Sequence, residues 1–512
     1  MKKRTGLLLL SLIIGAAAMA GALLCEKISA ERLIRPNLGY TDEMIAELPY
    51  FEVVVSGDEN RGIPCDVEGY SLGDGYIHLT LPPGVYKKAV VVYIRDAGGI
   101  LLARRVFDLT QTAMLGPWQV VLDEHCIPTL FFESSDPAEY EAMNASEDKS
   151  VICTGITHIC AGDRTIDISG LNASLQGRGS SSWGADSKKS YSLRLNKAVD
   201  LLGLGKNKNW NLVGNAFDVS LLKNITFNKI AEEAGIPYQP GMRNINLYVD
   251  GKYCGVYTLT TKVTVDKNRI PLKEGDYFYK MDPPEQDQPL LYRSETWFED
   301  GMEYPVADLL YPENADQREM AEALSLLQVY INTIEDPENA ALKDVCDLSL
   351  LAKYYWIEEA SMNFDAWQRS VYMYYLKNDG RMHMGPVWDM DLALGSPYEK
   401  EGMSFDTPEG WRVRNAGWYR ELFKNEDFKK AVADEYFNGG VREALLSGTD
   451  EFAAQRRILA QDGRLNFLLY GYANQFGEKS IYGDIDDYDE YCDDIVSFYS
   501  TRAAWIDEQM KP

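Results

Sequence analysis

The feature that most constrains this chain is one uncharged, apolar run close to its N-terminus. The run extends from Thr5 to Cys25, is rich in Leu, Ile and Ala, and follows three basic residues at positions 2 to 4. A basic start before such a run is typical of an export signal or of an N-terminal membrane anchor. No second run of this kind follows. We therefore expect the rest of the chain to fold outside the cytoplasm and to meet a membrane only through this segment.

Residues 1–25 allow two outcomes. Ala18-Met19-Ala20 offers a cleavage site with small residues at both ends, which favours a signal peptide. The apolar run is also long enough to span a bilayer as an uncleaved anchor. Under either outcome the sequence predicts a protein that is secreted or held at the cell surface.

Charge and composition disfavour several classes of protein. Asp and Glu number 78 against 51 Lys and Arg, which gives a formal net charge of -27 at pH 7. Such a surface repels nucleic acid, so a nucleic-acid partner is not expected. Hydrophobic residues make up 46% of the chain and aromatic residues 12%, which is enough apolar surface for a globular fold.

The cysteines and histidines do not indicate a metal site. After Cys25 the cysteines are scattered without a C-x-x-C pair, and none of the four His lies near another at ligand spacing. Export permits disulfides, so Cys153 and Cys160 can pair across adjacent strands. The scattered spacing equally fits buried free thiols.

Short alternating or apolar runs, cut by turn residues, predict a small β-sandwich at residues 36–135. Its clearest strands are Phe51–Val55 and Ala89–Arg95. The following stretch, Glu133–Lys149, is acidic and poor in aliphatic residues, so we interpret it as a linker. The region from about Val151 is therefore expected to fold without the sandwich.

Residues 151–398 mix strands and helices. Alternating strands between Asn244 and Thr260 flank Asp250-Gly251, a dipeptide that supplies the positive φ angles of a tight hairpin turn. Helical spacing and caps predict three helices, at Val219–Gly235 after a capping Asp218, at Ala315–Ile334 and at Leu348–Asn363. The fold class is therefore α+β, followed by a helical C-terminal extension at residues 399–512.

A loop of small residues is the first candidate binding site. It contains Gly177, Arg178, Gly179, Ser180, Ser181 and Ser182, and Lys188 and Lys189 open the strand that follows. Glycines let backbone N–H groups approach a phosphate closely, and a lysine can neutralise its charge. The spacing is not that of a Walker loop, and a plain turn explains the composition equally well.

Three acids form the second candidate. Asp365 follows a predicted helix, and Asp389 and Asp391 lie between Gly385 and Gly395. Oxygen ligands of this kind suit Mg²⁺, but alternating side chains reach one cation only where the backbone kinks. Asp391 can instead cap a helix or pair with an arginine. Because Asp389 is framed by apolar residues, its burial would require a metal or a charged partner.

We expect structural roles for the tryptophans and glutamates that lie near these motifs in the sequence. Four tryptophans are expected in the core rather than against an adenine ring, namely Trp183, Trp210, Trp367 and Trp388. Glu358 and Glu359, on the helix before Asp365, are expected to be solvated or paired.

Four blocks of the sequence resemble, in order, the signature blocks of the CotH kinase family. They are Gly177–Trp183 with Lys188–Tyr191, Asn209–Leu212 with Asp218, Leu247–Tyr257, and Gly385–Gly395. The resemblance extends from about Val151 to Tyr398. It implies a reduced protein-kinase-like fold in residues 151–398.

The resemblance also implies an activity. Family members bind ATP with Mg²⁺, with Mn²⁺ as an alternative, and phosphorylate secreted or surface proteins, spore-coat proteins in the founding case. By position in the family's blocks, Asp365 would act on the substrate hydroxyl, and Asp389 with Asp391 would hold the metal. Arg178 with Lys188 or Lys189 would hold phosphates, and the serines at 180 to 182 would donate hydrogen bonds.

Three positions depart from the family's usual pattern. Thr261 stands where the family usually carries a Glu, Lys223 where it carries an Arg, and Ser370 where many relatives have an Asn. The missing Glu would remove a partner that orients an ATP-binding lysine. Three functions therefore stay open: an extracellular metal-dependent protein kinase, a nucleotide-binding pseudokinase, and a surface adhesin or carbohydrate-associated scaffold.

Overall fold

A computed structural model describes most of the chain after residue 126. The described residues are 127–160, 166–179, 181–184, 188–250, 252–282, 306–336, 342–400, 402–470, 481–482, 485 and 487–511, with the backbone of strands β1 to β6 between 51 and 108. The expected signal or anchor at residues 1–25 and Ser180 of the small-residue loop lie outside them. Within the described residues, no helix is both long and apolar enough to cross a membrane.

The N-terminal strands form two antiparallel groups. Four of them make a sheet in the order β2-β1-β5-β6, and β3 pairs with β4. Their bounds are β1 (Phe51–Ser56), β2 (Ile63–Cys65), β3 (Tyr70–Gly73), β4 (Tyr76–Leu79), β5 (Ala89–Asp96) and β6 (Leu101–Asp108). The strands expected at Phe51–Val55 and Ala89–Arg95 are thus confirmed, while their packing as a sandwich stays a prediction.

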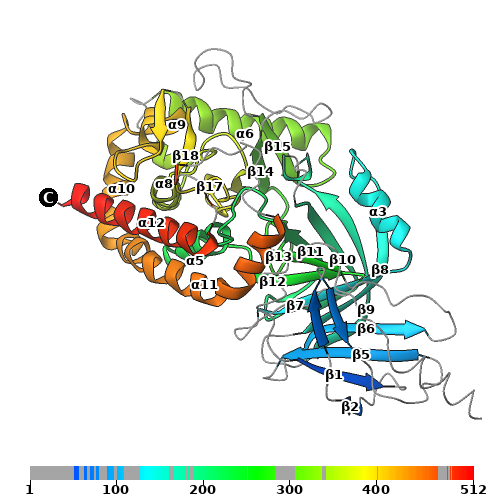
Figure 1. The fold of residues 1–512 in the computed structure, drawn as a ribbon. Helices are drawn as coiled ribbons and strands as arrows, with labels where there is room; N and C mark the ends of the chain where they lie inside the picture. Colours follow the sequence, from blue (N-terminus) through cyan, green and yellow to red (C-terminus); the bar gives the residue numbers. More distant parts are fainter. Residues whose placement is uncertain are drawn as a thin grey trace, which may run out of the picture.

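The next seven strands close into a barrel in the order β10-β11-β13-β12-β7-β8-β9 (Figure 1). They are β7 (Thr129–Ser134), β8 (Ile152–Cys160), β9 (Ile166–Arg178), β10 (Ser190–Asp200), β11 (Lys206–Val213), β12 (Met242–Val249) and β13 (Lys252–Thr261). The expected hairpin is β12 and β13: Val249 pairs with Lys252, and Asp250 has a φ of 51°. Buried aromatic and aliphatic side chains fill the barrel, among them Leu130, Leu193, Trp210 and Leu247.

The expected linker at Glu133–Lys149 is wrong. Its first residues belong to β7, which pairs in parallel with β12 and antiparallel with β8 and so closes the barrel. Helix α3 (Pro137–Ala145) follows; Asp136 caps it by accepting a hydrogen bond from the N–H of Ala138 at 2.9 Å. Met143 is fully buried against the barrel. The sequence did not predict this helix because most of its residues are polar or acidic. The few apolar residues that pack on the barrel are spaced along one side of the helix.

The cysteines of the described residues are buried free thiols. They are Cys153, Cys254, Cys346 and Cys492. The proposed disulfide between Cys153 and Cys160 is wrong, because Cys153 is free and both residues lie on the same strand, β8. The alternative of buried thiols is confirmed for these four.

A second sheet and three helices follow the barrel. The sheet has the order β15-β14-β16-β17, with bounds Val306–Tyr311, Tyr277–Asp282, Val371–Leu376 and Arg381–Met384. Helix α6 (Gln317–Glu335), the short α7 (Leu342–Val345) and α8 (Leu348–Ser361) pack nearby. The helices expected at Ala315–Ile334 and Leu348–Asn363 are confirmed as α6 and α8.

Helix α5 (Lys223–Glu233) lies between the barrel and the helical part. It starts four residues later than expected, yet Asp218 still serves its first turn by accepting a hydrogen bond from the N–H of Lys223 at 2.9 Å. Gly235 ends it with a φ of 81°. The N-cap position itself is Leu222, so the predicted cap at Asp218 is wrong in position, although its side chain accepts from the first N–H of the helix.

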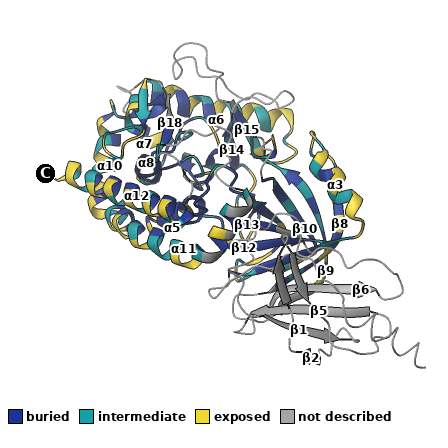
Figure 2. Ribbon diagram, in the orientation of Figure 1, coloured by how far each residue is buried: buried dark blue, intermediate teal, exposed yellow. Residues whose placement is uncertain are grey.

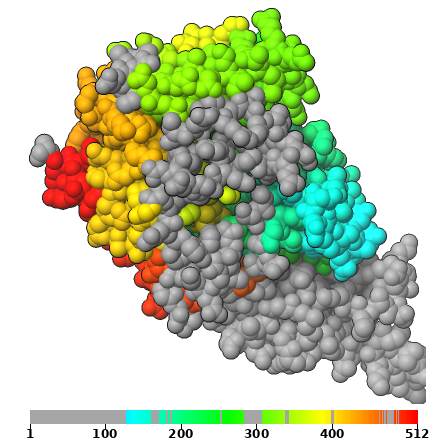
Figure 3. Space-filling model, turned by 90° about the horizontal axis from the view of Figure 1, so that it is seen from above, coloured from blue at the N-terminus to red at the C-terminus, as the bar shows by residue number. Residues whose placement is uncertain are grey.

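The C-terminal helices share one core with α5 and α8. After the hairpin β18 (Ser396–Lys400) and β19 (Met403–Phe405) come α9 (Gly417–Leu422), α10 (Glu426–Asn438), α11 (Val441–Tyr470) and α12 (Tyr488–Met510). Phe227 of α5 packs edge-on against Phe452 of α11 and Tyr499 of α12. Figure 2 shows buried residues on the inward faces of these helices, and Figure 3 shows the orange and red C-terminal helices across the molecule from α3, in cyan. The structure is thus a mixed α+β fold in which residues 399–511 complete the helical core.

Candidate functional site

Four carboxylates lie close together where the barrel meets the helical core. They come from separate parts of the chain: Asp218 before α5, Asp365 after α8, and Asp389 and Asp391 after β17. We call them the acid site. Desolvation raises the pKa of Asp389, and it raises the pKa of Asp391 well above the usual range for an aspartate. Repulsion from the other acids of the site adds to both shifts.

Asp389 occupies a kink in the chain. Its φ of 68° is in the left-handed region, which interrupts the alternation of an extended strand. The kink needed to let Asp389 and Asp391 share one cation is therefore present. Trp388 and Met390 on either side of it are buried, whereas Asp389 keeps part of its surface exposed and has two charged neighbours, Arg178 and Lys280.

Ser370 holds the Asp389 carboxylate from one side. Its hydroxyl donates a hydrogen bond to Asp389 Oδ2 at 2.9 Å, and its backbone N–H donates to Asp282 Oδ1 at 2.9 Å. The hydroxyl bond lowers the pKa of Asp389 and so opposes the effect of desolvation. Ser370 therefore orients an acid of the site.

Two cations face Asp389. Arg178, at the end of β9, lies 5.8 Å from the centre of the Trp388 ring, and desolvation lowers its pKa while Asp389 raises it. Lys280 of β14 forms an ion pair with Asp282. Desolvation lowers the pKa of Lys280, but the charges of Tyr372, Asp282 and Asp389 outweigh this effect and raise it to about 12.

Asp391 faces a third cation, Lys223 of α5. The Lys223 ammonium donates a hydrogen bond to the backbone carbonyl of Asp391 at 3.3 Å. Desolvation lowers the pKa of Lys223, and the nearby Asp218 and Asp391 raise it. Asp391 is not a helix cap, because the chain after it forms a turn and then β18.

Asp365 is positioned by the end of α8. The helix ends at Met362, which is left-handed with a φ of 50°, and the side chain of Asn363 then accepts a hydrogen bond from the N–H of Asp365 at 3.1 Å. Asn363 Nδ2 donates in turn to Glu358 Oε2 at 2.9 Å. Glu358 is 1% exposed, and burial raises its pKa to about 8. The buried, protonated Glu358 therefore supports, through Asn363, the turn that carries Asp365.

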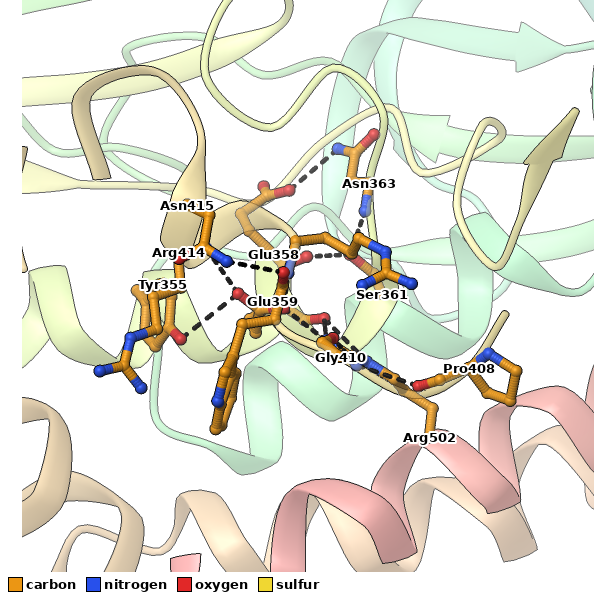
Figure 4. A network of polar contacts seen from close by, with 12 residues as sticks. Tyr355, Glu358, Glu359, Ser361, Asn363, Pro408, Gly410, Arg414, Asn415 and Arg502 are labelled. Carbon is orange, nitrogen blue, oxygen red and sulfur yellow. Dashed lines mark hydrogen bonds and ion pairs between the residues drawn. The ribbon is translucent and has the colours of Figure 1, made fainter. Parts of the chain in front are cut away.

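Glu359, the next residue, is paired (Figure 4). It is fully buried with Arg502 of α12, to which it forms an ion pair, and it accepts hydrogen bonds from the N–H groups of Arg412 at 2.9 Å and Arg414 at 2.6 Å. Arg502 also donates to the carbonyls of Pro408 and Gly410. We call this set the α8 network. Of the two outcomes expected for Glu358 and Glu359, burial with partners is confirmed and solvation is wrong.

A chain of buried amides joins the acid site to the barrel. The N–H of Met390 donates to Asn224 Oδ1 at 2.8 Å, and Asn224 Nδ2 donates to Asn215 Oδ1 at 3.1 Å. Asn215 Nδ2 then reaches Thr258 Oγ1 on β13 at 2.9 Å. The position of the acid-bearing segment therefore depends on α5 and on the barrel wall.

The two lysines after the small-residue loop have other partners in the described structure. Lys188 is 4% exposed and donates to the carbonyl of Val256 and, at 2.7 Å, to Asn466 Oδ1 of α11. Desolvation lowers its pKa to about 7. Lys189 donates to the carbonyl of Trp183 at 3.0 Å and lies 4.3 Å from the centre of that ring.

The small-residue loop folds back on Trp183. A side chain at Gly177 would lie 2.5 Å from this ring, so only glycine fits there, and Gly179 has a φ of 86°. The indole N–H of Trp183 donates to the carbonyl of Ser146 at 2.8 Å. Trp183, Trp210, Trp367 and Trp388 are all buried, so their assignment to the core is confirmed.

Thr261 lies far along β13 from Lys188. The Lys188 ammonium contacts Val256, and Thr261 is five residues further on, roughly 17 Å at the rise of an extended strand. Thr261 instead pairs with Gly241, whose N–H donates to its hydroxyl at 3.1 Å. A glutamate at position 261 would therefore not reach Lys188.

The structure thus brings Arg178, Asp365, Asp389 and Asp391 together, while Lys188 and Lys189 have other partners. Lys280 and Asp282 were missed, because they belong to no recognised block. Their signal was a pair of charges two positions apart, Lys280 and Asp282, at the end of the otherwise apolar strand Tyr277–Asp282, which places both on one face of the strand.

Comparison with protein-family models matches residues 175–506 to the family described as CotH kinase protein. The chain belongs to this family. Family membership indicates a kinase-like protein. The match extends into α12 and so covers most of residues 399–512, which the sequence predicted as a separate C-terminal extension. A search of curated proteins finds no match.

The acid site suits a cation that arrives with further ligands. Within the described residues, no group of three or more His, Cys, Asp or Glu side chains could by itself hold a metal ion. Mg²⁺ usually takes one or two carboxylates and completes its shell with phosphate oxygens and water. Asp389 and Asp391 fit that pattern, because desolvation and the nearby charge of Asp389 raise the pKa of Asp391.

Proposed function

We propose that this CotH family member binds ATP with Mg²⁺ or Mn²⁺ at the acid site and transfers a phosphoryl group to a hydroxyl of a secreted or surface protein. The observation that supports this most is the meeting of Arg178 from the small-residue loop with Asp365, Asp389 and Asp391. These residues come from distant parts of the chain, because Arg178 and Asp391 are 213 positions apart. Phosphoryl transfer needs both an anion-binding cation and metal-binding carboxylates.

Each residue has a separate part in the proposed reaction. A bound Mg²⁺ would neutralise phosphate charge, held by Asp389 and Asp391. Arg178, with a guanidinium that matches phosphate geometry, would bind phosphate oxygens beside Asp389. Asp365, fixed through Asn363, would accept or orient the proton of the acceptor hydroxyl.

Two aspartate variants separate metal binding from transfer. Asp389→Asn should abolish metal-dependent ATP binding, because it removes an anionic ligand, as measured by calorimetry. Asp365→Asn should leave binding nearly intact and lower phosphoryl transfer by roughly a hundredfold or more. Asp427→Asn on the outer side of α10 is the matched control and should change neither quantity. Normal ATP binding by Asp389→Asn would contradict the proposal.

A nucleotide-binding pseudokinase is the second candidate, supported by one observation. Lys188, proposed from the resemblance as a phosphate ligand, is buried and engaged by Asn466. If the wild type binds ATP with Mg²⁺ but transfers no phosphate to itself or to secreted proteins, the pseudokinase replaces the kinase. If it binds no nucleotide with either metal, a scaffold, such as an adhesin or carbohydrate-associated protein, becomes the better explanation.

We also propose that the protein acts outside the cytoplasm, secreted or anchored by residues 1–25. The support is the basic and apolar N-terminal pattern. Cell fractionation should find the protein in the medium or with the membrane. Recovery of the full-length chain from the cytosol, with residues 1–20 intact, would contradict this localisation.

A further inference from the structure

Lys280 and Asp282 bring an ion pair to the acid site from the sheet that follows the barrel. They are two positions apart on β14, and Tyr372 lies directly opposite Lys280 on β16, so all three side chains share one face of the sheet. The Lys280 ammonium pairs with Asp282 and lies 6.0 Å from the centre of the Tyr372 ring. The position of this ammonium is therefore set by two neighbours on the same face.

Ser370 joins this ion pair to Asp389. Its backbone N–H donates a hydrogen bond to Asp282 Oδ1 at 2.9 Å, and its hydroxyl donates to Asp389 Oδ2 at 2.9 Å. One serine thus contacts both carboxylates, and the Lys280 ammonium is bound to the first of them. The ammonium is therefore held close to Asp389, which the proposed function makes a ligand of the metal.

Arg178 reaches the same place from the barrel, at the end of β9. Desolvation raises the pKa of Asp389, and the charges of Arg178 and Lys280 both oppose that rise. Desolvation likewise raises the pKa of Tyr372, which the same two cations lower. Two cations from separate parts of the fold thus meet beside Asp389, where the phosphate oxygens of a metal-bound nucleotide would lie.

Lys280 differs from Lys188 in its exposure. The side chain of Lys280 is 27% exposed, so it is partly open to solvent. Lys188 is buried, and its ammonium donates to the carbonyl of Val256 and to Asn466 of α11. An ammonium has three N–H donors, so Lys280 can keep its bond to Asp282 and still bind a phosphate oxygen.

We propose that Lys280, oriented by Asp282, binds phosphate oxygens of ATP in the acid site together with Arg178. It takes the role that the resemblance implied for Lys188 or Lys189. This inference rests on the proposed function, because it needs a nucleotide at the acid site. It also removes the observation that supports a pseudokinase, because the burial of Lys188 then leaves the phosphate-binding lysine in place.

Calorimetry of ATP binding with Mg²⁺ tests the inference on the folded protein. Lys280→Gln should weaken binding by roughly tenfold to a hundredfold, because it removes a cation that contacts phosphate. Lys280→Arg keeps the positive charge and should recover most of this loss. Lys343→Gln, at an exposed position on α7, is the matched control and should bind like the wild type. If Lys280→Gln fails to fold, Lys280→Met, which keeps the apolar stem beside Tyr372, replaces it.

Asp282→Asn distinguishes phosphate binding from a purely structural ion pair. If the pair only stabilises β14, the loss of either partner breaks it, and both variants should weaken ATP binding equally. If Lys280 binds phosphate, Asp282→Asn retains the cation and should weaken binding at most several-fold. Equal losses in the two variants, or wild-type affinity in Lys280→Gln, would overturn the inference.

Asp389→Asn, measured in parallel, separates this inference from the proposed function. If the wild type binds ATP with Mg²⁺ and Asp389→Asn does not, the proposed nucleotide site stands. The result for Lys280→Gln then decides the role of the lysine alone. If the wild type binds no ATP with either metal, both the proposed function and the role of Lys280 are wrong.

Discussion

The acid site and the α8 network each contain a fully buried carboxylate, Asp218 and Glu359, but the charges around these carboxylates are compensated differently. In the α8 network, Glu359 meets a guanidinium and two backbone N–H groups, so its lone pairs are used. In the acid site, desolvation and then repulsion from the other three carboxylates raise the pKa of Asp391 well above its usual range. Complete pairing is typical of a structural role, and crowded like charges are typical of a site that binds a cation.

Glu358 and Glu359 show the same contrast between neighbours on one helix. Glu359 pairs with Arg502, whereas Glu358 has the neutral partners Asn363 and Tyr354, and desolvation raises its pKa to about 8. The charge of Glu359 is neutralised by the Arg502 cation, whereas Glu358 avoids a buried charge by staying protonated. The two residues differ because Glu359 contacts Arg502 of α12, whereas Glu358 accepts a hydrogen bond from Asn363 in the turn that carries Asp365.

The largest effect is expected from removing β7, because the barrel that supplies Arg178 would then be open. A fragment that starts at residue 127 should unfold cooperatively in a denaturant titration. A fragment that starts at residue 150 loses the strand that joins β12 to β8 and should unfold without cooperativity. A sharp transition for the shorter fragment would show that the acid site needs no closed barrel.

Breaking the α8 network should have the next largest effect. Arg502→Met leaves Glu359 buried without its cation, which should lower the free energy of unfolding by about 3–5 kcal/mol. Arg442→Gln is the matched control, since it breaks the partly exposed pair with Asp507 between α11 and α12 and should have a smaller effect. Equal effects in urea denaturation would remove the distinction between the two pairs.

Glu358→Gln should change the pH dependence of stability. Desolvation raises the pKa of Glu358 in the folded state from the ordinary 4.5 to about 8, so the folded state holds a proton that the unfolded state releases. The wild type should therefore lose stability as pH rises from about 4.5 to 8, at most by roughly 1.4 kcal/mol per unit of pKa shift. The variant cannot ionise and should lack this loss.

Urea unfolding at pH 5 and at pH 8 measures that difference. At pH 5 the two proteins should be similar, because glutamine can still accept the hydrogen bond of Asn363. At pH 8 the variant should be the more stable one. The same pH dependence in both proteins would mean that Glu358 is not protonated in the folded protein, which would remove the contrast with the charged Glu359.

The smallest effect is expected from Ser370→Ala. The variant loses the hydroxyl that donates to Asp389, so the pKa of Asp389 should rise further and Mg²⁺-dependent ATP binding should weaken by roughly tenfold. The loss should be greater at pH 6 than at pH 8 in calorimetry. Ser404→Ala, which removes a surface contact to Asp406, is the control. Unchanged affinity at both pH values would mean that Ser370 does not tune the acid site.

Local patterns in the sequence determined much of the fold. The Asp250-Gly251 turn, the capping box that begins α6 with Asp316 and Glu319, and the apolar spacing of α8 depend on residues a few positions apart. The resemblance likewise placed Asp365 and Asp389 in separate blocks that the structure brings together. Short-range backbone preferences and the order of motifs are properties of the sequence itself.

Other features were decided only by tertiary structure. β7 joined the barrel because its partner strand, β12, lies more than a hundred residues further on, and no local pattern indicates a pairing over that distance. Lys188 was assigned to phosphate, yet Asn466 of a distant helix engages it. Glu358 and Glu359 have adjacent positions and the same side chain, and only the groups packed around each decide which is protonated and which is paired. Burial and charge compensation are properties of neighbours in space, which the sequence does not state.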